Sequence, residues 1–274
     1  MVHAGAMVNL VRGYHAHRRT NVTGTVELLR LAATGRPTMV HFVSTLAACP
    51  AEPASDSPVA ERPLPAGRTP DTGYGQSKWA AEQLVQAAAD RGMAVAVHRL
   101  GEVMPSTGTG IPNPGSRVEL LVQACLRVGA YFTSDLSTDY TPVDHVGRLL
   151  VAAVTHRRAG YFHLLRPGPL PFDDLLGGFG SAFGLRKVEY QDFWQAVHEA
   201  AAAEPDNRPL AGALALLPVP TTRPERSPMA FEDATARFGT TRAAGLAALA
   251  DARSLPANPD GLHRYVAHHL ARRG

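Results

Sequence analysis

Short apolar, β-branched runs alternate with amphipathic segments through the first part of the chain. Residues 39–45 (MVHFVST), 95–100 (VAVHRL) and 161–165 (YFHLL) have the composition of buried strands. Residues 19–33 and 74–90 place apolar side chains at helical spacing, and a glycine follows each segment. Strands that alternate with helices in this way favour an α/β fold built on a doubly wound parallel sheet.

Helical patterns dominate the rest of the chain. Residues 118–128 and 143–153 predict two further helices, and most of the sequence after about residue 160 has helical character. A proline-rich stretch at 218–228 predicts a break. We therefore expect an α/β domain over 1–160 and a smaller, mostly helical portion over 161–274.

Composition narrows the function classes. Of the 274 residues 45% are hydrophobic, the formal net charge is +3, and only Lys78 and Lys187 among the basic residues are lysines. The arginines are scattered, which argues against a nucleic-acid-binding surface. Cys49 and Cys125 have no disulfide or metal-site spacing, so no metal is expected. The sequence shows no signal peptide and no membrane span, and a cytoplasmic location is expected.

Tyr74 and Lys78 are the first candidate for chemistry. They lie four residues apart, which places both side chains on one face of a helix. A carbonyl that receives a hydride needs a proton on its oxygen, and a phenol can supply it. A neighbouring ammonium is expected to lower the pKa of the phenol. An ordinary surface pair has the same spacing, but lysine is rare in this chain, which favours the catalytic interpretation.

Two polar sites accompany this pair. Ser44 and Thr45 end a predicted strand, where side chains face the ligand crevice of an open α/β sheet. Either hydroxyl can bind a substrate carbonyl, and a strand-end cap is the alternative. Asn21, in NVTGT, is either a helix cap or a residue that holds a water or a backbone kink near Lys78.

Several stretches together resemble the extended short-chain dehydrogenase/reductase family. The resemblance is closer to the thioester reductase domain that ends many non-ribosomal peptide synthetases and carboxylic acid reductases. It spans nearly the whole chain, and GYGQSKWAAE and NVTGTVELLRLA are its most specific pieces. The matching segments are residues 3–32, 40–47, 73–92, 97–104, 139–154 and 161–176.

This resemblance implies a Rossmann-like NAD(P)-binding catalytic domain and a helical substrate-binding portion. It assigns catalysis to Thr45, Tyr74 and Lys78, with Asn21 in support and Ser44 as the alternative hydroxyl. The implied cofactor contacts are His3, Ala4, Gly5, Ala6, Ser44, Tyr74, Lys78, Leu100, Gly101, Glu102 and Val103. It further implies NADPH as cofactor and, as partner, a phosphopantetheinyl carrier protein that bears an acyl or peptidyl thioester. The helical portion, including Phe193, Trp194, Leu262 and Tyr265, either caps the crevice or is a plain subdomain.

One family feature is absent from the sequence. Members have a Gly-x-x-Gly-x-x-Gly loop after a first strand, which holds the pyrophosphate at a helix N-terminus. We therefore expect an N-terminally truncated sheet, weak NADPH binding by these residues alone, and self-association through an exposed sheet edge. The alternatives are a degenerate homologue without dinucleotide binding, a dehydrogenase or epimerase acting on a sugar or another small carbonyl, and a relative that cyclises a thioester.

Overall fold

The chain forms two compact units. In this computed structural model the described residues are 1–36, 38–50, 58–134, 137–166, 168, 170–217, 219–220, 238–250 and 258–272. The first unit consists of Met1–Gly101, His145–Leu165 and Ala236–Ser254. The second consists of Glu102–Asp144, Arg166–Thr235 and Leu255–Gly274. The chain thus passes between the units several times, whereas the sequence pattern indicates one division near residue 160.

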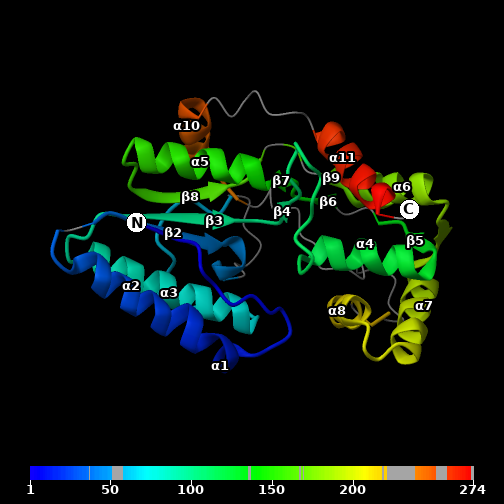
Figure 1. Cartoon of the computed structure of the whole chain (residues 1–274). Coiled ribbons are helices and arrows are strands. Elements are labelled where there is room, and N and C mark those ends of the chain that lie inside the picture. Colours follow the sequence, from blue (N-terminus) through cyan, green and yellow to red (C-terminus); the bar gives the residue numbers. More distant parts are fainter. Residues whose placement is uncertain are drawn as a thin grey trace. The chain divides into compact units, whose positions relative to one another are not determined.

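A four-stranded parallel sheet lies at the centre of the first unit (Figure 1). Its strands, in spatial order, are β1 (Val2–His3), β2 (Val40–Thr45), β3 (Val95–Leu100) and β8 (Gly160–Leu164). The predicted parallel pairing of residues 39–45 with 95–100 is confirmed, because Val40 pairs with Val95 and Thr45 pairs with Leu100. The predicted third strand is also present, one residue earlier than expected.

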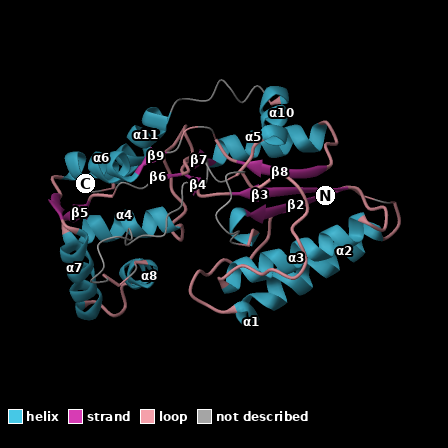
Figure 2. Ribbon diagram, turned by 180° about the vertical axis from the view of Figure 1, so that it is seen from behind, coloured by secondary structure: helices cyan, strands magenta, loops and turns pink. Residues whose placement is uncertain are grey.

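Helices cover both faces of this sheet, as expected for a doubly wound fold (Figures 1 and 2). Helices α2 and α3 lie on one face, and α5 and α10 lie on the other. The helical elements of the first unit are α1 (Tyr14–His17), the π-helix η1 (Arg18–Thr23), α2 (Gly24–Ala33), the 3-10 turn η2 (Leu46–Ala48), α3 (Gly73–Ala89), most of α5 (Val143–Thr155) and α10 (Thr241–Leu249). Phe42, Val97 and Tyr161 pack with Val85 of α3 to form the core on the α2–α3 side.

Helices make up most of the second unit. They are α4 (Arg117–Val128), α6 (Phe172–Phe183), α7 (Tyr190–Ala203), α8 (Arg208–Leu216) and α11 (Asn258–Ala271). The short strands are β4 (Val103–Met104), β5 (Ala130–Phe132), β6 (Ser137–Thr138), β7 (Thr141–Pro142), β9 (Leu170–Pro171) and β10 (Arg186–Val188). Ser116 caps α4 by accepting the Glu119 N–H at 3.2 Å. The predicted break at 218–228 lies outside the described residues apart from positions 219 and 220.

Two buried histidines of the sheet are expected to make the first unit sensitive to acid. Burial is the main cause that lowers the pKa of His98 to about 3 and that of His163 to about 4. Both values lie below the ordinary value of 6.5. The unfolded chain therefore binds more protons at mildly acidic pH.

We expect the free energy of unfolding to be constant above about pH 6.5 and to fall as the pH drops from there toward 4. Each histidine adds a slope of up to about 1.4 kcal/mol per pH unit. Urea unfolding between pH 8 and 4.5 measures this. His98→Phe, which removes one titrating ring, should flatten the curve. A wild-type stability that does not change between pH 6.5 and 4.5 would contradict the assignment.

Candidate active site

Thr45, Tyr74 and Lys78 come together where β2 ends against the start of α3. The side chain of Thr45 forms a hydrogen bond with Tyr74. The Lys78 ammonium donates to the Val43 carbonyl at 2.9 Å and lies 4.1 Å from the centre of the Phe42 ring. All of these residues belong to the first unit, so the predicted grouping rests on contacts inside one compact body.

Ser44 lies beside this group but faces a different partner. The Ser44 hydroxyl donates to the Glu82 carboxylate at 2.5 Å and is 4% exposed, whereas Thr45 contacts Tyr74. The structure therefore places Thr45, and not Ser44, next to the Tyr74 phenol.

Asn21 lies in the π-helix η1, a distortion that is frequent at functional sites. Its Oδ1 accepts the Met7 N–H at 2.7 Å, and its Nδ2 donates to the Met7 carbonyl at 2.9 Å. The same Nδ2 donates to the Ser77 hydroxyl at 2.9 Å. Asn21 thus ties the segment after β1 to α3, next to Lys78, and is not the cap of a helix.

The predicted cofactor contacts divide between the two units. His3 lies near Lys78. Burial lowers the pKa of the His3 imidazole, and the positive charge of Lys78 lowers it further. Residues 4–6 follow β1 as an exposed segment outside any helix or strand, where the resemblance implies a turn along the cofactor. Leu100 is the last residue of β3, and Gly101 is the last residue of the first of the three segments that make up the first unit.

Glu102 and Val103 begin the second unit. The Glu102 N–H donates to the Asp139 carboxylate at 2.9 Å, and the Glu102 carboxylate pairs with Arg117 at 3.2 Å. These four cofactor candidates, from Leu100 to Val103, therefore lie where the chain passes from one unit to the other.

The pKa of Tyr74 departs from expectation. Burial raises it to about 12, and the Thr45 hydrogen bond opposes the shift. The sequence predicts that the charge of Lys78 lowers the pKa of Tyr74, but burial of the phenol away from water has the larger effect here. Burial also lowers the pKa of Lys78 to about 8, against the opposing charge of Glu82. Tyr74 is therefore a protonated donor at neutral pH, which is the form that a reduction requires.

Two further polar side chains near the site have no motif in the sequence. His17 is fully buried, its ring centre lies 6.0 Å from that of Tyr74, and its Nδ1 donates to the Gly13 carbonyl at 3.1 Å. Glu82 lies four residues after Lys78, so extension of the helical spacing by one step would have found it.

A glycine allows α3 to begin close to β2. A Cβ on Gly75 would overlap the Ala47 carbonyl oxygen, which belongs to the turn after Thr45. We expect Gly75→Ala to push the first turn of α3 away and to lower activity by about 10- to 100-fold. The matched change is Gly245→Ala in α10, where a Cβ meets nothing within 4 Å. That variant should gain about 0.5–1 kcal/mol of stability and keep full activity. Full activity in Gly75→Ala would contradict the packing.

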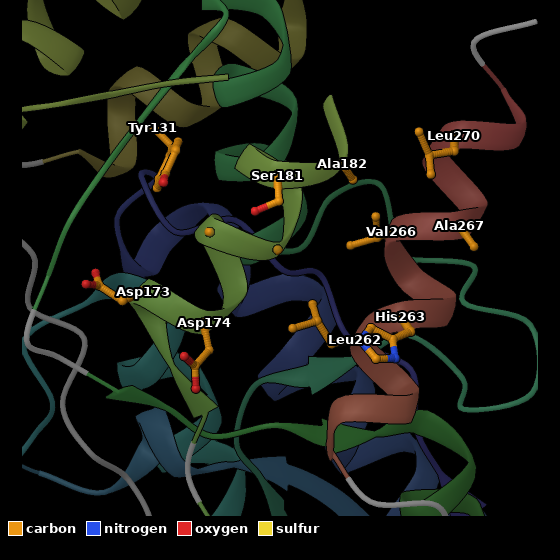
Figure 3. Close-up of a pocket in the computed structure, with 12 residues that line it drawn as sticks. Tyr131, Asp173, Asp174, Ser181, Ala182, Leu262, His263, Val266, Ala267 and Leu270 are labelled. Carbon is orange, nitrogen blue, oxygen red and sulfur yellow. The ribbon is translucent and has the colours of Figure 1, made fainter. Parts of the chain in front are cut away.

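A separate cavity of about 690 Å³ lies in the second unit, between α6 and α11 (Figure 3). Its lining residues are Tyr131, Asp173, Asp174, Gly177, Gly178, Ser181, Ala182, Leu262, His263, Val266, Ala267 and Leu270. None of them belongs to the predicted catalytic set. Of the aromatic and apolar residues expected to cap a crevice, Leu262 lines this cavity, whereas Phe193 and Tyr265 are fully buried in the core and Trp194 packs against it.

Membrane-spanning helices and metal clusters are both absent from the described residues. No helix there has the length and apolar character needed to cross a membrane. Within the same part of the chain, no three His, Cys, Asp or Glu side chains gather as possible metal ligands.

A family model and a curated relative both match this chain. The model of an NAD-binding family described as male sterility protein matches residues 1–150. A linear gramicidin synthase polypeptide of Brevibacillus parabrevis is 33% identical over 204 residues, which are 73% of this chain and 4% of the synthase polypeptide. The chain therefore spans only a small part of that relative.

Solved structures match over almost the whole chain. The terminal R domain from the myxalamid PKS-NRPS biosynthetic pathway is 28% identical, with a TM-score of 0.82 over 99% of this chain and 67% of that one. A thiolation-reductase di-domain from an archaeal non-ribosomal peptide synthetase has the same fold, with a TM-score of 0.77 at 17% identity over 99% of this chain and 57% of that one. The predicted resemblance to terminal reductase domains is thus confirmed, as is the Rossmann-like fold class.

Proposed function

The chain belongs to the NAD-binding male sterility protein family, and from this premise we propose that it acts in the reduction of a thioester. The proposed substrate is an acyl or peptidyl group on the phosphopantetheine arm of a carrier protein, and the product is an aldehyde. The grouping of Thr45, Tyr74 and Lys78 at the end of β2 carries this proposal. The likeness to the terminal R domain supports the substrate class.

The residues present fit the nicotinamide end of a dinucleotide, and we propose NADPH as the form used. Lys78 has three N–H donors, of which the described residues take one, for the Val43 carbonyl. The other two can bind ribose hydroxyls at the crevice edge of the sheet. When bound, the reduced nicotinamide supplies a hydride to the thioester carbon.

Tyr74 and Thr45 then handle the oxygen of the substrate. As the carbonyl carbon accepts the hydride, negative charge develops on the oxygen. The Tyr74 phenol, protonated because burial raises its pKa, donates its proton there. The Thr45 hydroxyl, bonded to Tyr74, holds the same oxygen in place. When the carbonyl re-forms, the hydroxyl returns its proton to the Tyr74 phenolate, the C–S bond breaks and the electron pair leaves on sulfur. Sulfur takes up a proton, so that the products are an aldehyde and a free thiol.

A carrier protein is the proposed partner. The archaeal structure is a thiolation-reductase di-domain of a non-ribosomal peptide synthetase, which supports this choice of partner. A thioester on a flexible arm reaches a site at a strand end without transfer of the acyl group to the enzyme.

The test uses the full-length polypeptide that contains these residues, together with an acyl-loaded carrier protein. Loss of NADPH absorbance with one equivalent of trapped aldehyde per NADPH is the expected result. Unloaded carrier and a UDP-sugar serve as controls. NADPH-independent release of acid or of a cyclic product would contradict the proposal, as would conversion of the UDP-sugar alone.

A further inference from the structure

Three consecutive residues at the end of β2 each bind one of three residues spaced four apart on α3. The contacts join Thr45 to Tyr74, the Val43 carbonyl to Lys78, and the Ser44 hydroxyl to Glu82. Side chains four residues apart lie on one face of a helix. The strand and the helix are therefore held in register by three adjacent contacts, and two of them involve the proposed catalytic residues.

The third contact is part of a buried ion pair. Glu82 is 2% exposed and Arg99 is fully buried. The Arg99 Nε lies 3.1 Å from each Glu82 oxygen, and its Nη2 lies 2.8 Å from Oε2. The Ser44 hydroxyl donates to Oε1 at 2.5 Å. A carboxylate with this many donors in a water-free interior has little freedom to move.

Arg99 is itself fixed from two sides. Its Nη2 donates to the Arg62 carbonyl at 2.8 Å, in the loop that leads to α3. Its Nη1 lies 3.1 Å from the Nε2 of His163, whose Nδ1 lies 2.8 Å from the Gly239 carbonyl oxygen. Arginine only donates, so His163 accepts through Nε2 and donates through Nδ1. Ser44, Arg99 and His163 are aligned across β2, β3 and β8. The pair thus anchors Glu82 to the sheet rather than to α3 alone.

We propose that Glu82 is a positioning residue for the reaction: held by Arg99, it binds Ser44 and so keeps Tyr74 and Lys78 of α3 in register with Thr45 and Val43 of β2. This inference rests on the proposed function for its kinetic consequence. The contacts themselves do not depend on that function.

The charge of Glu82 also acts on Lys78. The groups that face the ammonium are Phe42 and the Val43 carbonyl from β2, His3 from β1, and Glu82 from α3 itself. Burial lowers the pKa of Lys78, and Glu82 is the group that raises it. Loss of the carboxylate therefore makes the ammonium lose its proton at lower pH.

The kinetic test compares three single variants of the full-length polypeptide. Glu82→Gln should lower kcat by about 100-fold while the KM for the acyl-loaded carrier changes by less than about threefold, because the reacting groups are misplaced and the surface that binds the carrier is not. It should also move the alkaline limb of the kcat–pH profile, where Lys78 loses its proton, down by about 1 pH unit. Ser44→Ala, which keeps both charges, should lower kcat by about 10-fold without moving that limb.

Glu61→Gln is the matched control, because Glu61 is another buried carboxylate of the first unit. It accepts the N–H groups of His163 at 2.8 Å and Ala243 at 3.0 Å and does not touch α3 in the described contacts. This variant should lower Tm while leaving kcat and the alkaline limb unchanged. Equal losses of kcat in Glu61→Gln and Glu82→Gln would show that the loss comes from impaired folding, and would overturn the proposal.

A second readout does not need activity. The sequence has only two lysines, Lys78 and Lys187, and Lys187 is exposed. NMR of labelled lysine side chains therefore follows Lys78 with an internal reference. In Glu82→Gln the Lys78 signal should titrate at lower pH and the Lys187 signal should not move. If the natural polypeptide reduces no thioester and this shift still occurs, the contact is supported and the proposed function is contradicted.

If Glu82→Gln does not fold, a double variant answers the question. Glu82→Met with Arg99→Met replaces the buried pair by apolar side chains, which generally preserves folding. It should show the same loss of kcat and the same downward shift of Lys78. A folded double variant with wild-type kcat, or with an unshifted Lys78, overturns the proposal.

Discussion

Replacing Tyr74 with phenylalanine is expected to lower the rate of thioester reduction by about 10²- to 10⁴-fold. The phenol forms a hydrogen bond with Thr45 and, because burial raises its pKa to about 12, it is protonated at neutral pH. Phenylalanine has the same ring and no proton to give. Single-turnover reduction of an acyl-loaded carrier measures the loss, and the KM for the carrier should hardly change.

Tyr161→Phe is the matched control for this variant. Tyr161 belongs to the same unit and forms a hydrogen bond with Gln86, far along α3 from the site. It should lose a little stability and keep its rate. A Tyr74→Phe protein that reduces the thioester at more than a tenth of the wild-type rate would remove Tyr74 from the proposed role.

Lys78→Met is expected to have the second-largest effect. Loss of a charged donor to the ribose should raise the KM for NADPH by about 10- to 100-fold and also lower kcat. Stability should move the other way. Burial lowers the Lys78 pKa to about 8, so the charged form opposes folding at neutral pH. Methionine beside Phe42 should therefore stabilise the fold by up to about 3 kcal/mol.

Steady-state kinetics and thermal unfolding together check this combination. Lys187→Met removes the only other lysine, from an exposed strand, and should change neither quantity. A Lys78→Met protein that is less stable than wild type and binds NADPH normally would show that Lys78 has a structural role and no catalytic one.

The sequence predicts the elements that carry the candidate site because their signals are local. β2 and β3 each come from an apolar run of six residues, and α3 comes from one periodic segment of 17 residues. The spacing of Tyr74 and Lys78 follows from the helix alone. Thr45 is predicted as a strand-end hydroxyl, although local pattern does not distinguish it from Ser44.

Long-range packing determines what the sequence does not predict. Ser44 turns to Glu82 because the α3 face of β2 is where the Glu82–Arg99 pair lies, 38 residues away along the chain. Asn21 bonds Ser77 across 56 residues through a π-helix that no spacing rule indicates. The raised pKa of Tyr74 reflects burial by the whole unit. The return of residues 236–254 to the first unit likewise depends on tertiary contacts such as those of Glu61.

The most direct test of the central claim follows a hydride into the product. The full-length polypeptide is supplied with an acyl-loaded carrier and with NADPH that carries deuterium at the transferred position of the nicotinamide ring. The account predicts an aldehyde with one deuterium on its carbonyl carbon, formed at similar rates by the wild type and by Tyr161→Phe and about 10²- to 10⁴-fold more slowly by Tyr74→Phe. An aldehyde without deuterium, or a released acid in place of the aldehyde, would contradict it.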